Sequence, residues 1–154
     1  MQIALIGCGA IGTALLELVK DDAGLQVAAI VVPGEGADAA RAVAQRFAPQ
    51  AVVVQAVPVD GIDLVVEAAG HAAIEQHVLP ALRRGVPCIV ASVGALSAEG
   101  LLEQLEAAAR SGGTQMLSRA DDLGFVEGAA WGENSVGTNA IGTALATRRA
   151  VQVH

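Results

Sequence analysis

The chain has 154 residues, of which 53% are hydrophobic and 16% are charged, and its formal net charge at pH 7 is −7. This length and apolar content allow one domain with a buried core and exclude a chain that is disordered throughout. The acidic balance argues against a nucleic-acid partner, and no apolar run reaches the length of a membrane-spanning helix, which argues against a membrane partner.

Along the first 116 residues, short apolar segments of strand length alternate with longer helical patterns. We expect strands over residues 2–7, 25–32, 51–55, 63–69 and 87–92. We expect helices over about residues 11–20, 38–47 and 72–84, and a fourth that begins at Ser97 and ends at the glycines near residue 112. Pro80 predicts a kink in the third helix. This alternation is typical of α/β proteins, so residues 1–116 are predicted to form a doubly wound, mostly parallel Rossmann-like sheet.

The pattern changes after Gly113, where glycines at irregular spacing surround the single tryptophan, Trp131. We expect only a helix over about residues 139–147 and a strand over residues 150–154 in this part of the chain. The sequence therefore predicts two units, an α/β domain over residues 1–116 and an incomplete fragment over residues 117–154.

The glycine-rich turn "GCGAIG" follows the first predicted strand and opens the first predicted helix. This is the spacing G-x-G-x-x-G in the context that favours dinucleotide binding. Gly7 permits the tight turn, Gly9 lets a pyrophosphate approach the backbone, and Gly12 allows the helix to pack closely on the strand. The helix N-terminus adds unpaired N–H groups and the positive end of the helix dipole. The candidate cofactor-binding residues of this turn are Gly7, Cys8, Gly9, Ala10, Ile11 and Gly12.

The second strand lacks the acidic residue that usually binds the adenosine ribose. Val32 and Pro33 stand at its end, where Asp or Glu is common. Glu35 or Asp38 can serve from the loop that follows, although a solvated loop position is the simpler interpretation of both. The sequence therefore leaves the choice between NAD and NADP open.

Two further turns at the carboxyl edge of the predicted sheet are candidates for cofactor contact. They comprise Ala69, Gly70 and His71 after the fourth strand, and Ser92, Val93 and Gly94 after the fifth. A helix cap or a surface position explains His71 equally well, and a plain strand-to-helix turn explains the second group equally well.

The remaining reactive side chains predict no catalytic or metal site. Cys8 and Cys88 are too few for a disulfide framework or a metal-ligand set, and we expect both to be reduced in a cytoplasmic protein. A helix N-terminus can lower the pKa of the Cys8 thiol, but the better interpretation is that Cys8 fills space in the turn. We expect His77 to lie on a helix surface.

Four motifs give residues 1–116 a resemblance to a known family: "GCGAIG", "VVEAAGHAAIEQHVLPALRRGVPC", "ASVGALSAEGL" and "LEAAARSGGTQ". They resemble the amino-terminal half of L-aspartate dehydrogenase, with the minor departure that Ala68 replaces the usual cysteine. The resemblance implies oxidation of L-aspartate to iminoaspartate with NAD or NADP, in NAD biosynthesis. Family members continue after "GGTQ" with another strand and a substrate domain that holds the catalytic histidine, and we find neither in this sequence.

Residues 119–154 resemble instead the start of a GAF domain of acetoin-regulator-type transcriptional activators. The motifs "GAAW" and "VGTNAIGTALA" carry this second resemblance. Three functions remain open: an NAD(P)-dependent L-aspartate dehydrogenase, a dinucleotide-binding module without turnover, and a chimeric or regulatory protein. The expected partners are a dinucleotide, L-aspartate if a substrate site exists, and a second copy of the chain in a homo-oligomer.

Overall fold

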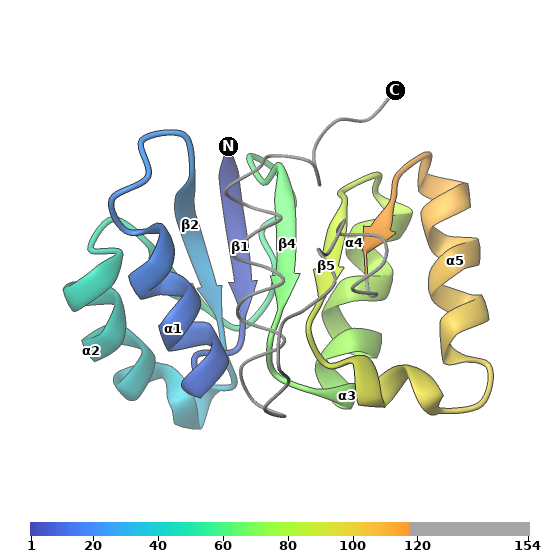
Figure 1. Ribbon diagram of the computed structural model, residues 1–154, viewed down its shortest axis with the longest axis horizontal. Coiled ribbons are helices and arrows are strands. Elements are labelled where there is room, and N and C mark those ends of the chain that lie inside the picture. Colours follow the sequence, from blue (N-terminus) through green and yellow to red (C-terminus); the bar gives the residue numbers. More distant parts are fainter. Residues whose placement is uncertain (118–154) are drawn as a thin grey trace, which may run out of the picture.

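The computed structural model describes residues 1–117, which form an α/β unit with helices on both faces of a parallel sheet (Figure 1). The strands in chain order are β1 (Gln2–Ile6), β2 (Gln26–Val31), β3 (Val52–Val54), β4 (Leu64–Glu67), β5 (Cys88–Val90) and β6 (Met116–Leu117). Their spatial order is β3-β2-β1-β4-β5-β6, and every neighbouring pair is parallel. This confirms the predicted doubly wound, Rossmann-like sheet.

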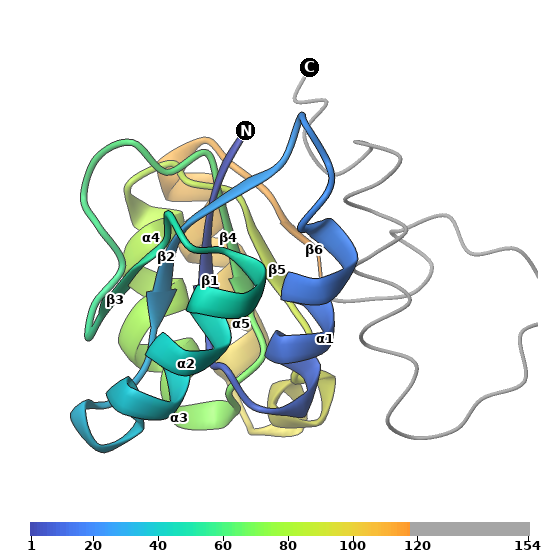
Figure 2. The ribbon, with the colours of Figure 1, turned by 90° about the vertical axis from the view of Figure 1, so that its left-hand side faces the viewer.

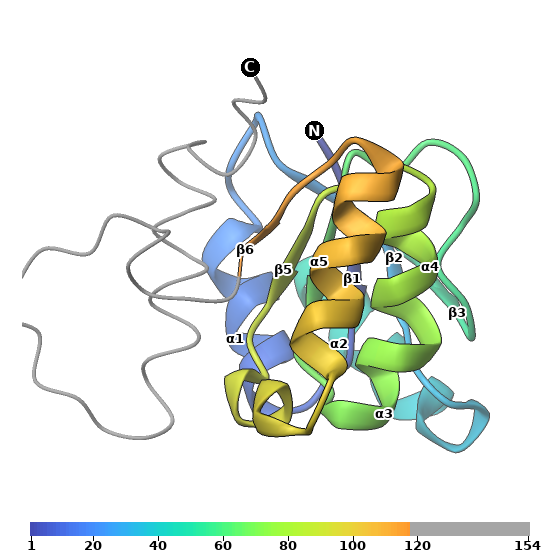
Figure 3. The same ribbon diagram turned by 90° about the vertical axis from the view of Figure 1, so that its right-hand side faces the viewer.

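The helices cover the two faces in pairs, as Figures 2 and 3 show. Helices α1 (Ala10–Val19) and α2 (Ala37–Phe47) cover one face, and the other carries α5 (Leu101–Gly112) beside a continuous helix made of α3 (His71–Ala73), η2 (Ile74–Val78) and α4 (Leu79–Arg83). Two short 3-10 turns, η1 (Gly34–Gly36) and η3 (Val93–Ser97), follow the ends of β2 and β5.

The strand side chains alternate between the two hydrophobic clusters beneath these helices. Ile3 and Leu5 of β1 pack under α1 and α2, whereas Ala4 and Ile6 pack on the opposite side of the sheet. All four are buried, so β1 is covered on both faces, as a central strand of a parallel sheet must be. The five strands predicted from the sequence are all present, and their ends agree within two residues.

The predicted start of the last helix at Ser97 is wrong. Helix α5 begins at Leu101, because Gly100 adopts a φ of 77° that interrupts the helix before it. Ser97 belongs instead to η3, where its hydroxyl donates to the Gly94 carbonyl at 2.7 Å. The predicted end of this helix is confirmed, since Gly113 closes it with a φ of 65°.

The helix that contains Pro80 is irregular before the proline. The turn that precedes it widens into the π-helical segment η2. Proline lacks an N–H group, and its ring crowds the carbonyl one turn earlier, so a wider turn accommodates it.

The strand that the sequence was expected to lack after "GGTQ" is present. Residues Met116 and Leu117 form β6, and they pair in parallel with Cys88 and Ile89 of β5. The alternation of strands and helices therefore continues at least to residue 117. The predicted fragment over residues 117–154, with its helix and strand, lies beyond the described residues apart from its first position.

Candidate functional site

The candidate site lies where the sheet changes winding direction. Strand β1 pairs with β2 on one side and with β4 on the other, and the connections that leave β1 and β4 run to opposite faces of the sheet. This arrangement opens a crevice at the carboxyl ends of the central strands, which is where ligands bind in doubly wound folds.

The three glycines of the turn after β1 have three different surroundings. Gly7 has a φ of 91°, and a Cβ there would lie 2.7 Å from the Ala68 carbonyl oxygen. A Cβ on Gly12 would collide with the Gly7 carbonyl oxygen, so helix α1 touches the turn that leads into it. A Cβ on Gly9 would meet nothing within 4 Å, so the backbone there borders open space. These are the three roles expected of a pyrophosphate-binding turn.

Helix α1 presents its N-terminus to this open space. Gly9 is its N-cap residue, and neither a side-chain cap nor an acidic residue occupies its first turn. The first N–H groups of a helix need partners, and an anion is a favourable one. Burial raises the pKa of the Cys8 thiol, and the neighbouring Thr13 hydroxyl only partly opposes this effect. Cys8 is therefore a space-filling thiol and not an activated one.

The buried carboxylate of Glu67 joins the two loops on the other side of the crevice. It is 0% exposed at the end of β4. Its Oε1 accepts hydrogen bonds from the backbone N–H groups of Ala69 and Gly70, both at 2.6 Å, and from the Ser92 hydroxyl at 2.8 Å. Its Oε2 accepts from the Ser92 N–H at 3.2 Å. Four donors thus satisfy one carboxylate and fix the loop after β4 to the loop after β5.

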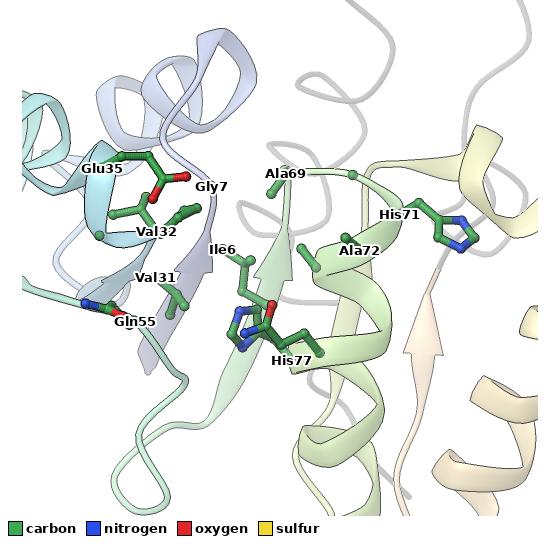
Figure 4. A pocket seen from close by; sticks show the side chains of 15 residues that line it. Ile6, Gly7, Val31, Val32, Glu35, Gln55, Ala69, His71, Ala72 and His77 are labelled. Atoms are coloured by element: carbon green, nitrogen blue, oxygen red, sulfur yellow. The ribbon is translucent and has the colours of Figure 1, made fainter.

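A cavity of about 610 Å³ opens between the ends of β1 and β2 and the start of the helix that follows β4 (Figure 4). Apolar side chains such as Ile6, Val31 and Val32 form its floor. The polar side chains along its walls are Glu35, Gln55, His71, Gln76 and His77.

Of the residues predicted from the sequence, four line this cavity: Gly7, Ala69, Gly70 and His71. Gly9 and Ala10 are exposed at the start of α1, whereas Ser92 is held by Glu67. The others lie nearby in the chain: Cys8, Ile11 and Gly12 in the glycine turn, and Val93 and Gly94 in η3. The structure thus places all of these positions at the carboxyl edge of the sheet.

Sequence reasoning missed Glu67 and misjudged His77. An acidic residue at the end of an otherwise apolar strand is a signal that could have identified Glu67. His77 is half-buried and lines the cavity, a role that the predicted helix-surface position did not include. Burial lowers the pKa of its imidazole, which favours the neutral form.

Comparison with known proteins identifies the family. A family model described as homoserine dehydrogenase, NAD binding domain, matches residues 7–118. The chain belongs to this NAD-binding domain family. Within residues 1–117, no helix of this NAD-binding domain is long and apolar enough to cross a membrane, and no three His, Cys, Asp or Glu side chains form a metal-binding group.

Several relatives of this NAD-binding domain carry the name L-aspartate dehydrogenase. The protein from Pseudomonas aeruginosa is 50% identical over 128 residues, and the protein from Cupriavidus taiwanensis is 45% identical over 127 residues. Each match covers 82% of this chain and 48% of the relative, so the chain spans about half the length of these curated relatives. The aspartate dehydrogenase from Thermotoga maritima shares the fold, with a TM-score of 0.56 at 22% identity over 88% of this chain and 49% of that chain.

Proposed function

We propose that residues 1–116 are the dinucleotide-binding half of an L-aspartate dehydrogenase and that the glycine turn holds the pyrophosphate. The open space over Gly9, between two glycines that have no room for a side chain, carries this proposal. The residues fit a dinucleotide, because the free N-terminus of α1 can bind the pyrophosphate and the adjacent cavity is large enough for the adenosine. When bound, the nicotinamide supplies the hydride acceptor for oxidation of the amine-bearing carbon of L-aspartate.

We assign Ala69, Gly70, His71 and the turn from Ser92 to Gly94 to the same site. Glu67 already accepts hydrogen bonds from the N–H groups of Ala69, Gly70 and Ser92. These N–H groups therefore point away from the ligand. The carbonyl oxygens of Gly70, Ser92 and Gly94 accept hydrogen bonds within their own turns. The carbonyl oxygen of Ala69 is thus the group of the first loop that suits a ribose hydroxyl or carboxamide N–H group.

The variant Gly9→Val tests the assigned site. Gly9 has a φ of −78° and open space around it, so valine fits the fold, but its side chain occupies the approach of the pyrophosphate. We expect loss of NADH binding, followed by fluorescence, with an unchanged thermal unfolding temperature. Ala39→Val, at an exposed position of α2, is the matched control and should bind as the wild type does. Unchanged affinity in Gly9→Val would refute the assignment, and absence of binding to the wild type at millimolar NADH would refute the proposed function.

Activity toward L-aspartate is a separate proposal, because this chain spans about half of its curated relatives. The described residues place no catalytic acid or base beside an amino-acid site, so we expect the chain alone to bind NADH without oxidising L-aspartate. Nicotinamide absorbance after addition of NAD and L-aspartate measures this directly. Clear turnover would contradict the interpretation as a binding half and would place a catalytic group within this chain.

Three further proposals rest on the sequence. The motifs "GAAW" and "VGTNAIGTALA" favour a GAF-like fragment over residues 117–154, which makes the chain a chimera. Sequencing of the gene across residues 114–120 tests for such a junction.

The free thiols Cys8 and Cys88 fit a reducing, cytoplasmic location. A homo-oligomer of this chain is the third proposal, and light scattering tests it.

A further inference from the structure

The wall of the cavity nearest β2 carries one carboxylate and no lysine or arginine. Glu35 is the only acidic side chain among the residues that line the cavity. It comes from η1, and Figure 4 shows its carboxylate pointing toward the Gly7 turn. Glu35 is exposed to solvent, as a loop position is expected to be, and it also lines the cavity.

We infer that this domain selects NAD over NADP and that Glu35 is the residue that makes the distinction. The inference rests on the proposed function. It deepens that function by assigning the side chain that contacts the adenosine ribose.

The position of Glu35 matches the expected path of the dinucleotide. A pyrophosphate at the N-terminus of α1 directs the adenosine ribose over the carboxyl end of β2. Val32, the first residue after β2, is 7% exposed and has an apolar side chain, and its N–H donates to the Val54 carbonyl at 3.0 Å, so neither its side chain nor its N–H serves the ribose. Glu35 lies three residues after Val32, in η1, and its carboxylate is the acidic group that can accept a hydrogen bond from the ribose.

The charge of the ribose 2′ substituent decides the preference. A 2′-hydroxyl can donate a hydrogen bond to the Glu35 carboxylate, whereas a 2′-phosphate brings a second negative charge against it. Arg41 is the basic residue closest in sequence, and it pairs with Asp38 at 2.7 Å. Arg41 also does not line the cavity.

The two histidines of the cavity do not offset this charge. Burial lowers the pKa of His77, so its imidazole is neutral at pH 7. Figure 4 shows the His71 ring turned away from Glu35, and its Nε2 lies 3.8 Å from the Glu75 carboxylate. A 2′-phosphate would therefore find no lysine or arginine among the residues that line the cavity.

Titration of the wild type, Glu35→Gln and Glu17→Gln with NADH and with NADPH tests the inference. We expect the wild type to bind NADH at least about tenfold more tightly than NADPH, a difference of about 1.4 kcal/mol. Glu35→Gln should bring the two affinities close to equal. Glu17→Gln makes the same substitution at an exposed position of α1 outside the cavity, and it should keep the wild-type ratio.

The outcomes separate the two proposals. NADPH binding equal to or tighter than NADH binding, or a wild-type ratio in Glu35→Gln, overturns the assignment of Glu35 and leaves the proposed function standing. Equal effects of the two substitutions overturn it as well, because they indicate a long-range charge effect. If neither cofactor binds to the wild type, the proposed function itself fails.

Discussion

At the scale of single residues, Glu67 carries the most hydrogen bonds of any side chain at the site. Its carboxylate accepts four of them while being fully buried, and three come from backbone N–H groups. Hydrogen bonds to a charged acceptor are stronger than neutral ones, and a buried group without its partners is costly. Glu67 is therefore a positioning residue, which acts on the site through Ala69, Gly70 and Ser92.

The variant Glu67→Gln should weaken both the fold and the site. The glutamine amide places an NH₂ group against N–H donors, so at least one buried donor loses its acceptor, at a cost of about 1–3 kcal/mol. We expect a lower free energy of unfolding in urea and a weaker affinity for NADH, with a smaller loss for AMP, which does not reach the loop after β5. Ser92→Ala removes one donor of the four and should cause a smaller change. Wild-type values in Glu67→Gln would contradict this role.

At the scale of elements, the sequence predicts those features that depend on residues close together in the chain. The turn from Gly7 to Gly12 is recognisable because its strand, turn and helix follow one another in the chain. The start of α5 was misplaced because serine is a common cap, whereas the left-handed backbone of Gly100 decides where the helix begins. The π-helical turn before Pro80 depends on how the helix relieves the proline, which composition does not reveal.

The parts of the site that the sequence did not predict come from contacts between distant segments. Glu67 and Ser92 are 25 positions apart and meet only because β4 and β5 are neighbours in the sheet. The cavity likewise combines β2, η1 and the helix after β4, so Glu35 and His77 acquire a role only in the folded chain. The alternation of strands and helices predicted a doubly wound parallel sheet. The side-chain contacts between distant segments follow only from the folded structure.

At the scale of the whole molecule, the two cores on either side of the sheet share strands and must be lost together. Cys88 of β5 lies in the core beneath α4 and α5, and it is 1% exposed. Burial raises the pKa of its thiol well above the ordinary value. The folded state therefore keeps this proton, whereas the unfolded chain releases it near pH 8.5.

This difference predicts a loss of stability in alkali. A group whose folded pKa is raised contributes stability that is complete below its unfolded pKa and is lost as the pH rises above it. We expect the free energy of unfolding to fall above about pH 8.5, by up to ~1.4 kcal/mol per pH unit from this thiol. Urea denaturation under reducing conditions at about pH 7.5 and about pH 9.5 measures the change.

The variant Cys88→Ala should be less stable than the wild type at the lower pH, because the substitution leaves a space in the core. It should nevertheless lose less stability than the wild type when the pH rises from the lower to the higher value. Cys8→Ala, at a half-buried thiol whose pKa is also raised by burial, should remove a smaller part of the alkaline loss than Cys88→Ala does. An alkaline loss of the same size in Cys88→Ala as in the wild type would show that other groups cause it.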